Sequence, residues 1–232
     1  MSVLRQAQDE QHGKVASLAG LRVVVSAGPT FEDIDPVRFI GNRSSGKMGF
    51  AIAAEAVARG AETVLVAGPV ALATPQGVRR IDVRSAAQMH DAVLAQLPVD
   101  VYIGAAAVAD FTPRQVATGK IKKRDGEEGL TLQLVRTPDI LADVATHARR
   151  PRLVVGFAAE TDDVEAYARG KLQKKKLDLI AANRVGVAGS GFESDDNALE
   201  VYWNGGMRAL GPAPKTLIAG QLLDLIVERL PG

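Results

Sequence analysis

The sequence predicts an α/β fold: a doubly wound, Rossmann-like parallel sheet with an inserted arm or hairpin and a C-terminal antiparallel hairpin. Short apolar runs rich in β-branched residues alternate with segments of helical periodicity, which is typical of a parallel sheet. A charged, glycine-rich stretch at 111–135 interrupts this alternation. An Asn-Gly pair between two alternating segments near the C-terminus predicts a hairpin turn.

The first half of the chain predicts three strands separated by two helices. Gly-Pro ends the first strand, Gly60 ends the first helix, and the second helix begins with Ser85 as its N-cap and stops at Pro98. In order, the segments are a strand at 21–30, a helix at 46–60, a strand at 62–68, a helix at 85–98, and a stretch at 99–110 that begins as a third buried strand.

The second half continues the pattern after the arm, in which LTLQLV offers an alternating strand. A helix is expected to open with Thr137 as its cap and Pro138 at its first position. The segments are the arm at 111–135, a helix at 137–150, a strand at 152–160, a helix at 161–176, a strand at 177–185, the hairpin at 198–210 and an amphipathic helix at 213–230.

Composition excludes several classes of protein. The 232 residues carry a formal net charge of +1, so no global basic field recruits nucleic acid. There are no cysteines, which rules out disulfides, thiolate catalysis and cysteine metal sites. No apolar run approaches the roughly 20 residues of a membrane span, and the polar tail at 1–19 lacks the apolar core of a signal peptide. We expect a cytoplasmic protein.

The segment GNRSSGKMGF, residues 41–50, is almost a P-loop. It has Met48 where a nucleoside triphosphatase needs Ser or Thr for Mg²⁺, and it does not directly follow its strand. Ser44, Ser45 and Gly46 nevertheless stand at a predicted helix start, where free N–H groups and the helix dipole favour an anion. The alternative is an ordinary serine cap.

Further features point to an anionic ligand. Lys120, Lys122, Lys123 and Arg124 lie together in the arm, and Lys171 and Lys175 share one helix face. Three strand ends carry small residues, in SAGPTFE, GAAAVADFTP and GFAAET, where the backbone can approach a nucleotide closely. The alternatives are a solvated charge run for the arm and tight helix–sheet packing for the small residues.

Taken together, SAGPTFEDIDPVRFIGNRSSGKMG, AAAVADF, KIKK, TPDIL, GFAAET and LDLIAAN resemble the phosphopantothenoylcysteine synthetases, in particular the synthetase half of the bacterial bifunctional coenzyme A biosynthesis proteins. The resemblance runs from about residue 20 to the C-terminus. It implies a ligase domain at 20–232, preceded at 1–19 by a tail or linker from a flavin-dependent decarboxylase half.

The resemblance implies the reaction and its partners. The family joins 4′-phosphopantothenate to L-cysteine: CTP converts the carboxylate into an acyl-cytidylate with release of pyrophosphate, and the cysteine amine then displaces CMP. Mg²⁺ is expected mainly on phosphate oxygens and water, so no metal ligand is assigned. A homodimer is expected, with the arm near the neighbour's site.

The resemblance also implies residue roles. Asn42 would hold the acyl carbonyl of the intermediate, and Lys120 would stabilise charge on the reacting phosphate. The expected nucleotide contacts are Ser44, Ser45, Gly46, Ala105, Ala106, Asp110, Lys120, Pro138, Asp139, Ile140, Leu141, Phe157, Lys171 and Lys175.

Two other functions stay open from the residues alone. An NAD(P)-dependent reductase would account for Tyr167 and Lys171, which have Tyr-x-x-x-Lys spacing, although no G-x-G-x-x-G follows the first strand. A regulatory nucleotide-binding module without catalysis is the second alternative.

Overall fold

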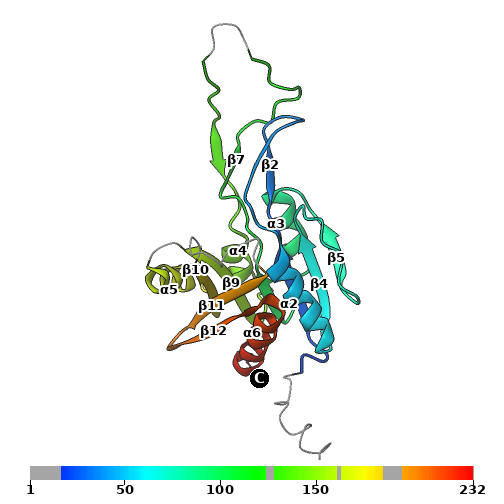
Figure 1. Ribbon diagram of the computed structural model, residues 1–232, viewed down its shortest axis with the longest axis vertical. Helices are drawn as coiled ribbons and strands as arrows, with labels where there is room; N and C mark the ends of the chain where they lie inside the picture. The colour runs from blue at the N-terminus through cyan, green and yellow to red at the C-terminus, as the bar shows by residue number, and fades with distance from the viewer. Residues whose placement is uncertain (1–16, 124–127, 161–162, 185–194, 232) are drawn as a thin grey trace, which may run out of the picture.

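The computed structural model describes residues 17–123, 128–160, 163–184 and 195–231, and its centre is an eight-stranded sheet (Figure 1). The strand order across the sheet is β12-β11-β10-β9-β6-β1-β4-β5. Its strands are β1 Arg22–Ala27, β4 Glu62–Ala67, β5 Arg79–Asp82, β6 Val101–Gly104, β9 Leu153–Glu160, β10 Leu179–Arg184, β11 Asp196–Trp203 and β12 Gly206–Pro214.

Six of these strands are parallel, β11 runs antiparallel to β10, and β12 runs antiparallel to β11. Numbered along the chain, the parallel strands lie in the order 3-2-1-4-5-6, the order of a Rossmann fold. The fold class predicted from the sequence is confirmed, including the C-terminal hairpin at the Asn204-Gly205 turn. Because the strand order reverses between β1 and β6, their carboxyl ends form the switch point where such sheets bind ligands.

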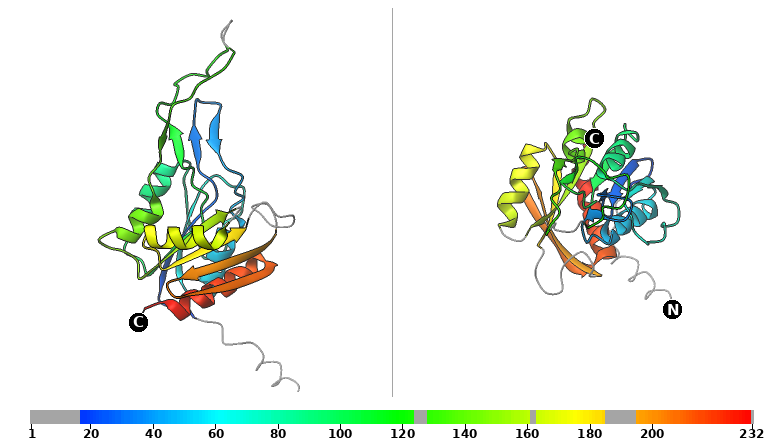
Figure 2. Two further views of the ribbon diagram at one scale, coloured as in Figure 1. Left: turned by 90° about the vertical axis from the view of Figure 1, so that its left-hand side faces the viewer. Right: turned by 90° about the horizontal axis from the view of Figure 1, so that it is seen from above.

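Helices cover both faces of the sheet (Figures 1 and 2). One apolar cluster joins β-strand side chains to α2 Lys47–Ala58 and α6 Lys215–Arg229. The other cluster joins the opposite face to α3 Ala86–Leu94, α4 Ile140–Thr146 and α5 Val164–Lys174. The buried Arg59 fastens α2 to α6, since its guanidinium donates to Glu55 at 2.8 Å and to Asp224 at 2.5 Å.

Two small hairpins rise side by side beyond the sheet (Figures 1 and 2). The first pairs β2 Phe31–Asp33 with β3 Phe39–Gly41, and the second pairs β7 Phe111–Pro113 with β8 Leu134–Arg136. The second hairpin is the base of the arm predicted at 111–135. The end of LTLQLV, the alternating strand predicted in the arm, pairs with β7 of its own chain.

Other boundaries differ from the sequence predictions. The helix expected at 137–150 begins at Ile140, and its N-cap is Asp139, whose side chain accepts from the amide of Ala142. Thr137 is therefore not the cap, and its hydroxyl donates to the carbonyl of Ala109 at 2.6 Å. Strands β2, β3, β5 and β7 were not foreseen, and the strand expected at 99–110 ends at Gly104.

The predicted tail at 1–19 falls largely outside the described residues, as do Arg124 of the arm and residues 161–162 of the predicted helix. Leu18, at the end of that tail, is fully buried in the core. Its amide donates to the carbonyl of Arg59 at 2.9 Å, so the folded unit begins at least two residues before the expected boundary. None of the described helices is long and apolar enough to cross a membrane.

Candidate functional site

A cavity of about 710 Å³ lies at the carboxyl ends of β1, β6, β9 and β10, beside the start of α2. Its floor includes a hydrogen bond of 3.0 Å between the hydroxyls of Ser26 and Tyr102. Tyr102 is 1% exposed, and burial raises its pKa to about 12. The cavity therefore occupies the position that the strand order favours for a ligand.

The start of α2 forms one wall of this cavity. The N-cap is Gly46, with φ of 77°, so the cap position itself carries no side chain, and the Ser44 hydroxyl oxygen accepts from the Gly46 amide at 3.4 Å. Neither Ser44 nor Ser45, for which an ordinary serine cap was the alternative, occupies the N-cap position. A Cβ on Gly49 would lie 2.5 Å from that of Ala27, so glycine lets the first turn pack directly on β1. Ser44, Ser45 and Gly46 line the cavity at this helix start, and the amino end of a helix is suited to phosphate.

Asn42 stands just before this wall. Its side-chain amide donates to the carbonyl of Ala107 at 2.5 Å, and its side-chain oxygen accepts from the amide of Ser44 at 3.2 Å. It thus connects the loop after β6 to the loop that enters α2. Asn42 does not itself line the cavity, but both residues that it holds do.

Helices α4 and α5 form the opposite wall, with Asp139, Ile140, Leu141, Lys171 and Lys175. Lys175 Nζ lies 2.9 Å from Asp139 Oδ1, which ties the two helix ends together. Leu141 reaches over the sheet because Gly104 has no side chain: a Cβ there would lie 2.8 Å from Leu141 Cδ2. This wall combines an apolar surface with two cations.

The third side contains residues to which the sequence analysis gave no role. Lys47 and Met48 come from the first turn of α2, Asn197 from β11 and Lys215 from the start of α6. Lys215 is 6% exposed, and burial together with the charge of Lys47 lowers its pKa. Asn197 is 5% exposed, and its side-chain oxygen has no hydrogen-bond partner among the described residues.

Most of the predicted contact residues meet in the cavity. Those that line it are Ser44, Ser45, Gly46, Ala105, Ala106, Asp110, Asp139, Ile140, Leu141, Phe157, Lys171 and Lys175. Asn42, Pro138 and Lys120 do not line it. Lys120 is an exposed residue of the arm, one position before a residue bound to the β2–β3 hairpin.

The missed lining residues differ in how far the sequence could have revealed them. Asn183 ends the LDLIAAN strand, so its position at a carboxyl strand end was a usable signal. Arg136 directly precedes the TPDIL segment, and Thr137 is its first residue. Asn197 and Lys215 come from the C-terminal hairpin and helix, and no local motif marks them.

The model of one family, described as the DNA/pantothenate metabolism flavoprotein C-terminal domain, matches residues 18–230. The chain belongs to this family. The resemblance inferred from its motifs is thereby confirmed. The family match begins at residue 18, which agrees with the buried position of Leu18 in the fold.

Relatives within the family are closely similar. The Coenzyme A biosynthesis bifunctional protein CoaBC of Vibrio cholerae is 50% identical over 214 residues, covering 92% of this chain and 54% of that protein. Its Escherichia coli K12 counterpart is 50% identical over 218 residues, covering 93% and 53%. The chain thus spans about half the length of these curated relatives.

A solved structure agrees in fold and extent. The crystal structure of the C-terminal domain of Coenzyme A biosynthesis bifunctional protein CoaBC gives a TM-score of 0.77 at 39% sequence identity. The match covers 93% of this chain and 97% of that one. The fold described here is therefore that of the C-terminal half of the bifunctional proteins.

Proposed function

We propose that this chain is a phosphopantothenate–cysteine ligase that uses CTP, the synthetase half of a bifunctional coenzyme A biosynthesis protein. The observation that carries the proposal is the cavity at the switch point, where a glycine-capped helix start faces Lys171 and Lys175. Similarity to the C-terminal half of proteins named for coenzyme A biosynthesis supports it.

The proposed reaction has two steps. A carboxylate oxygen of 4′-phosphopantothenate attacks the α-phosphorus of CTP, and the bond to the bridging oxygen breaks to release pyrophosphate. The cysteine amine then attacks the acyl carbon, loses a proton and displaces CMP. Neither step needs a protein nucleophile, so catalysis would consist of positioning and neutralisation of phosphate charge. A chain with no cysteine is consistent with cysteine as substrate.

Different walls of the cavity would bind different parts of the substrates. We assign phosphate binding to the N–H groups and hydroxyls at Ser44, Ser45 and Gly46, and base and ribose contacts to the wall with Leu141 and Phe157. Asn42 would hold the acyl group at Ala107. Lys215, close to the Lys47 turn, adds a buried cation that an anionic ligand would stabilise.

Mg²⁺ fits this site as a phosphate-bound ion. The described residues contain no group of three or more His, Cys, Asp or Glu that could hold a metal. Two residues with side-chain oxygens line the cavity, Asp110 and Asn197, and the buried side-chain oxygen of Asn197 has no hydrogen-bond partner among the described residues. Mg²⁺ commonly keeps several waters and binds one or two protein oxygens plus phosphates, where it neutralises charge on the triphosphate.

We also propose a homodimer in which the arm of one copy serves the cavity of the other. Lys120 does not line the cavity of its own chain, although the family pattern gives it a role at phosphate. The two projecting hairpins and the arm expose several large apolar side chains, a surface suited to burial against a second copy. These are Val37, Phe39, Phe111, Val116, Leu130 and Leu134.

The remaining parts of the proposal concern the whole protein. Residues 20–232, together with the buried Leu18 just before them, would form the ligase domain. The rest of the segment 1–19 would be a linker from a flavin-dependent decarboxylase half, in a protein of the cytoplasm. The bifunctional names and double length of the relatives support the fusion.

The reductase alternative loses its main support in the structure. Tyr167 is 58% exposed on α5 and does not line the cavity, whereas Lys171 does. The two side chains therefore do not meet at the described site as a catalytic pair would. Pyrophosphate release distinguishes a ligase from a non-catalytic nucleotide-binding module.

The test is a pyrophosphate-release assay with CTP and 4′-phosphopantothenate, with and without cysteine. We expect pyrophosphate in both cases and amide product only with cysteine, with ATP a much poorer nucleotide than CTP at equal concentration. Equal rates with the two nucleotides would overturn the CTP assignment alone. No pyrophosphate with all three substrates would overturn the ligase and favour the regulatory module.

A further inference from the structure

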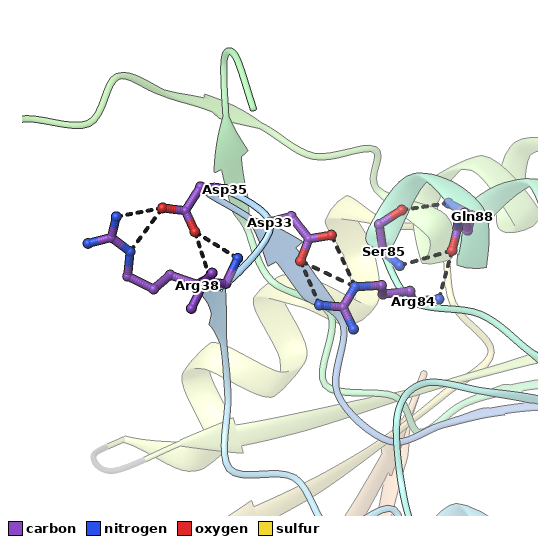
Figure 3. Close-up of polar contacts among 7 residues, drawn as sticks. Asp33, Asp35, Arg38, Arg84, Ser85 and Gln88 are labelled. Carbon is purple, nitrogen blue, oxygen red and sulfur yellow. Dashed lines mark hydrogen bonds and ion pairs between the residues drawn. The ribbon is translucent and has the colours of Figure 1, made fainter. Parts of the chain in front are cut away.

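The tip of the β2–β3 hairpin contains a buried carboxylate. The side chain of Asp35 is 0% exposed, although it stands in a turn that projects from the sheet. It accepts hydrogen bonds from the amides of Val37 and Arg38, both at 2.8 Å, and from the Arg38 guanidinium at 3.1 and 2.5 Å (Figure 3). These contacts close the turn.

The same carboxylate also binds the arm. The amide of Ile121 donates to Asp35 Oδ2 at 3.0 Å, and Arg38 Nη2 donates to the carbonyl of Ile121 at 2.9 Å. A further backbone bond of 2.9 Å joins the Ala117 amide to the Ile34 carbonyl. Both backbone groups of Ile121, the residue next to Lys120, are therefore fixed by the Asp35–Arg38 pair.

Closing a turn does not require this arrangement. A neutral Asn could accept the two turn amides, as Asn and Asp side chains commonly do. What the ionised carboxylate adds is the paired Arg38 and a second oxygen that accepts from Ile121. The described residues from Gly119 to Lys123 form no helix or strand of their own. The bonds of Ile121 to Asp35 and Arg38 are therefore what holds this segment to the hairpin.

We propose that Asp35 is a positioning residue: together with Arg38 it fixes the Lys120 segment to the hairpin, so that Lys120 is presented to the reacting phosphate in one orientation. The proposal rests on the proposed function of Lys120. Hydrogen bonds from the Arg38 side chain hold the pKa of Asp35 far below its usual range, so the carboxylate stays ionised at any assay pH. Holding a catalytic cation in one place is worth much in rate, since a misplacement of about 1 Å can cost about 100-fold.

Asp35→Asn tests the proposal, because it keeps the shape and the turn-closing oxygen but removes the charge and one acceptor. We expect faster hydrogen exchange of the Ile121 amide, and pyrophosphate release slower by about 10- to 100-fold in kcat with little change in KM for 4′-phosphopantothenate. Asp33→Asn is the matched control. Asp33 lies on the same hairpin and pairs with Arg84 at 2.6 Å (Figure 3). Among the described residues, the side chain of Asp33 bonds to Arg84 and not to the Lys120 segment.

The decisive measurement is a double-mutant cycle with Lys120→Gln. If Asp35 acts through Lys120, adding Asp35→Asn to the Lys120→Gln variant should lower its rate of pyrophosphate release by less than about twofold. A general folding defect would instead multiply the two losses, so additive free energies would overturn the proposal, as would unchanged exchange at Ile121. If Lys120→Gln alone is as active as the wild type, the proposed function of Lys120 fails, whereas faster exchange at Ile121 in Asp35→Asn would still show the anchor.

Discussion

The side-chain amide of Asn42 donates to the backbone carbonyl of Ala107 at 2.5 Å, across 65 residues of sequence. Through this bond the loop before α2 and the loop after β6 meet at the edge of the cavity. The same side chain accepts from the Ser44 amide, so one neutral carboxamide satisfies a donor and an acceptor at once.

Asn42→Asp should stop the second half-reaction. An ionised Asp offers only acceptors, so it would face the Ala107 carbonyl and a phosphorylated intermediate without a donor. We expect the acyl-cytidylate to accumulate with CTP and 4′-phosphopantothenate, and cysteine to convert it slower than in the wild type by about 100-fold. Mass analysis of the quenched mixture measures both species.

Asn204→Asp makes the same chemical change at the β11–β12 turn, away from the cavity, and should leave both steps unchanged. If Asn42→Asp completes the amide at the wild-type rate, Asn42 only closes the loop and the acyl contact lies elsewhere.

Lys120→Gln should lose the first half-reaction. Removing a cation that stabilises developing negative charge costs about 10²–10³ in rate. Pyrophosphate release in the absence of cysteine isolates this step. Lys122→Gln, two positions along the same exposed segment, is the control for lost charge in the arm and should change the rate by less than about threefold. Equal effects of both substitutions would mean that the arm contributes only a diffuse field.

Subunit complementation should show whether Lys120 acts in the neighbour's cavity. If Lys171, in the cavity, and Lys120, from the partner, serve one site, co-expressed Lys120→Gln and Lys171→Gln chains form hybrids with one intact site. Random pairing would then restore about a quarter of the wild-type activity. Lys120 acting within its own chain would restore none.

Light scattering at the assay concentration gives the oligomeric state independently. We expect a particle of about twice the 24.5 kDa chain mass. A monomer at that concentration would contradict the dimer and would remove the basis for complementation.

Alkaline pH should remove the stabilisation that Tyr102 supplies. Burial raises its pKa to about 12 in the folded protein, against about 10 in an unfolded chain. Between these two pKa values only the unfolded state ionises. The contribution of Tyr102 to the free energy of unfolding is therefore complete below pH about 10, and about 2–3 kcal/mol of it is lost as the pH rises toward 12. Urea unfolding of the wild type and Tyr102→Phe at pH 8 and 11 measures the difference.

At pH 8 the wild type should be the more stable of the two by about 1 kcal/mol, since Phe cannot bond to Ser26. At pH 11 this advantage should shrink or reverse. Tyr167→Phe, on the exposed side of α5, controls for removal of a hydroxyl. A constant advantage across the pH range would show that Tyr102 ionises equally in both states.

Features encoded by neighbouring residues were predictable. Ser85 and Gln88 form the capping box of α3, and Asn204-Gly205 makes the C-terminal turn, because both depend on residues a few positions apart. Strand β5 was missed because it has no such local signal. Arg79–Asp82 is a polar edge strand without apolar alternation, and only its pairing with β4 makes it a strand. The N-cap of α4 is Asp139 and not the predicted Thr137, because the Thr137 hydroxyl donates to the carbonyl of Ala109 in the loop after β6.

The sequence by itself determined the parallel sheet and most of the cavity wall, because burial periodicity and strand ends are local patterns that the Rossmann order brings to one edge. Only the tertiary structure decided that Asn197 and Lys215 enter that cavity, that Lys120 stays outside it, and that Asp35 is buried against Ile121. Those placements depend on contacts between segments far apart in the chain. Such contacts produce no repeating pattern of residues within either segment, so neither segment alone predicts them.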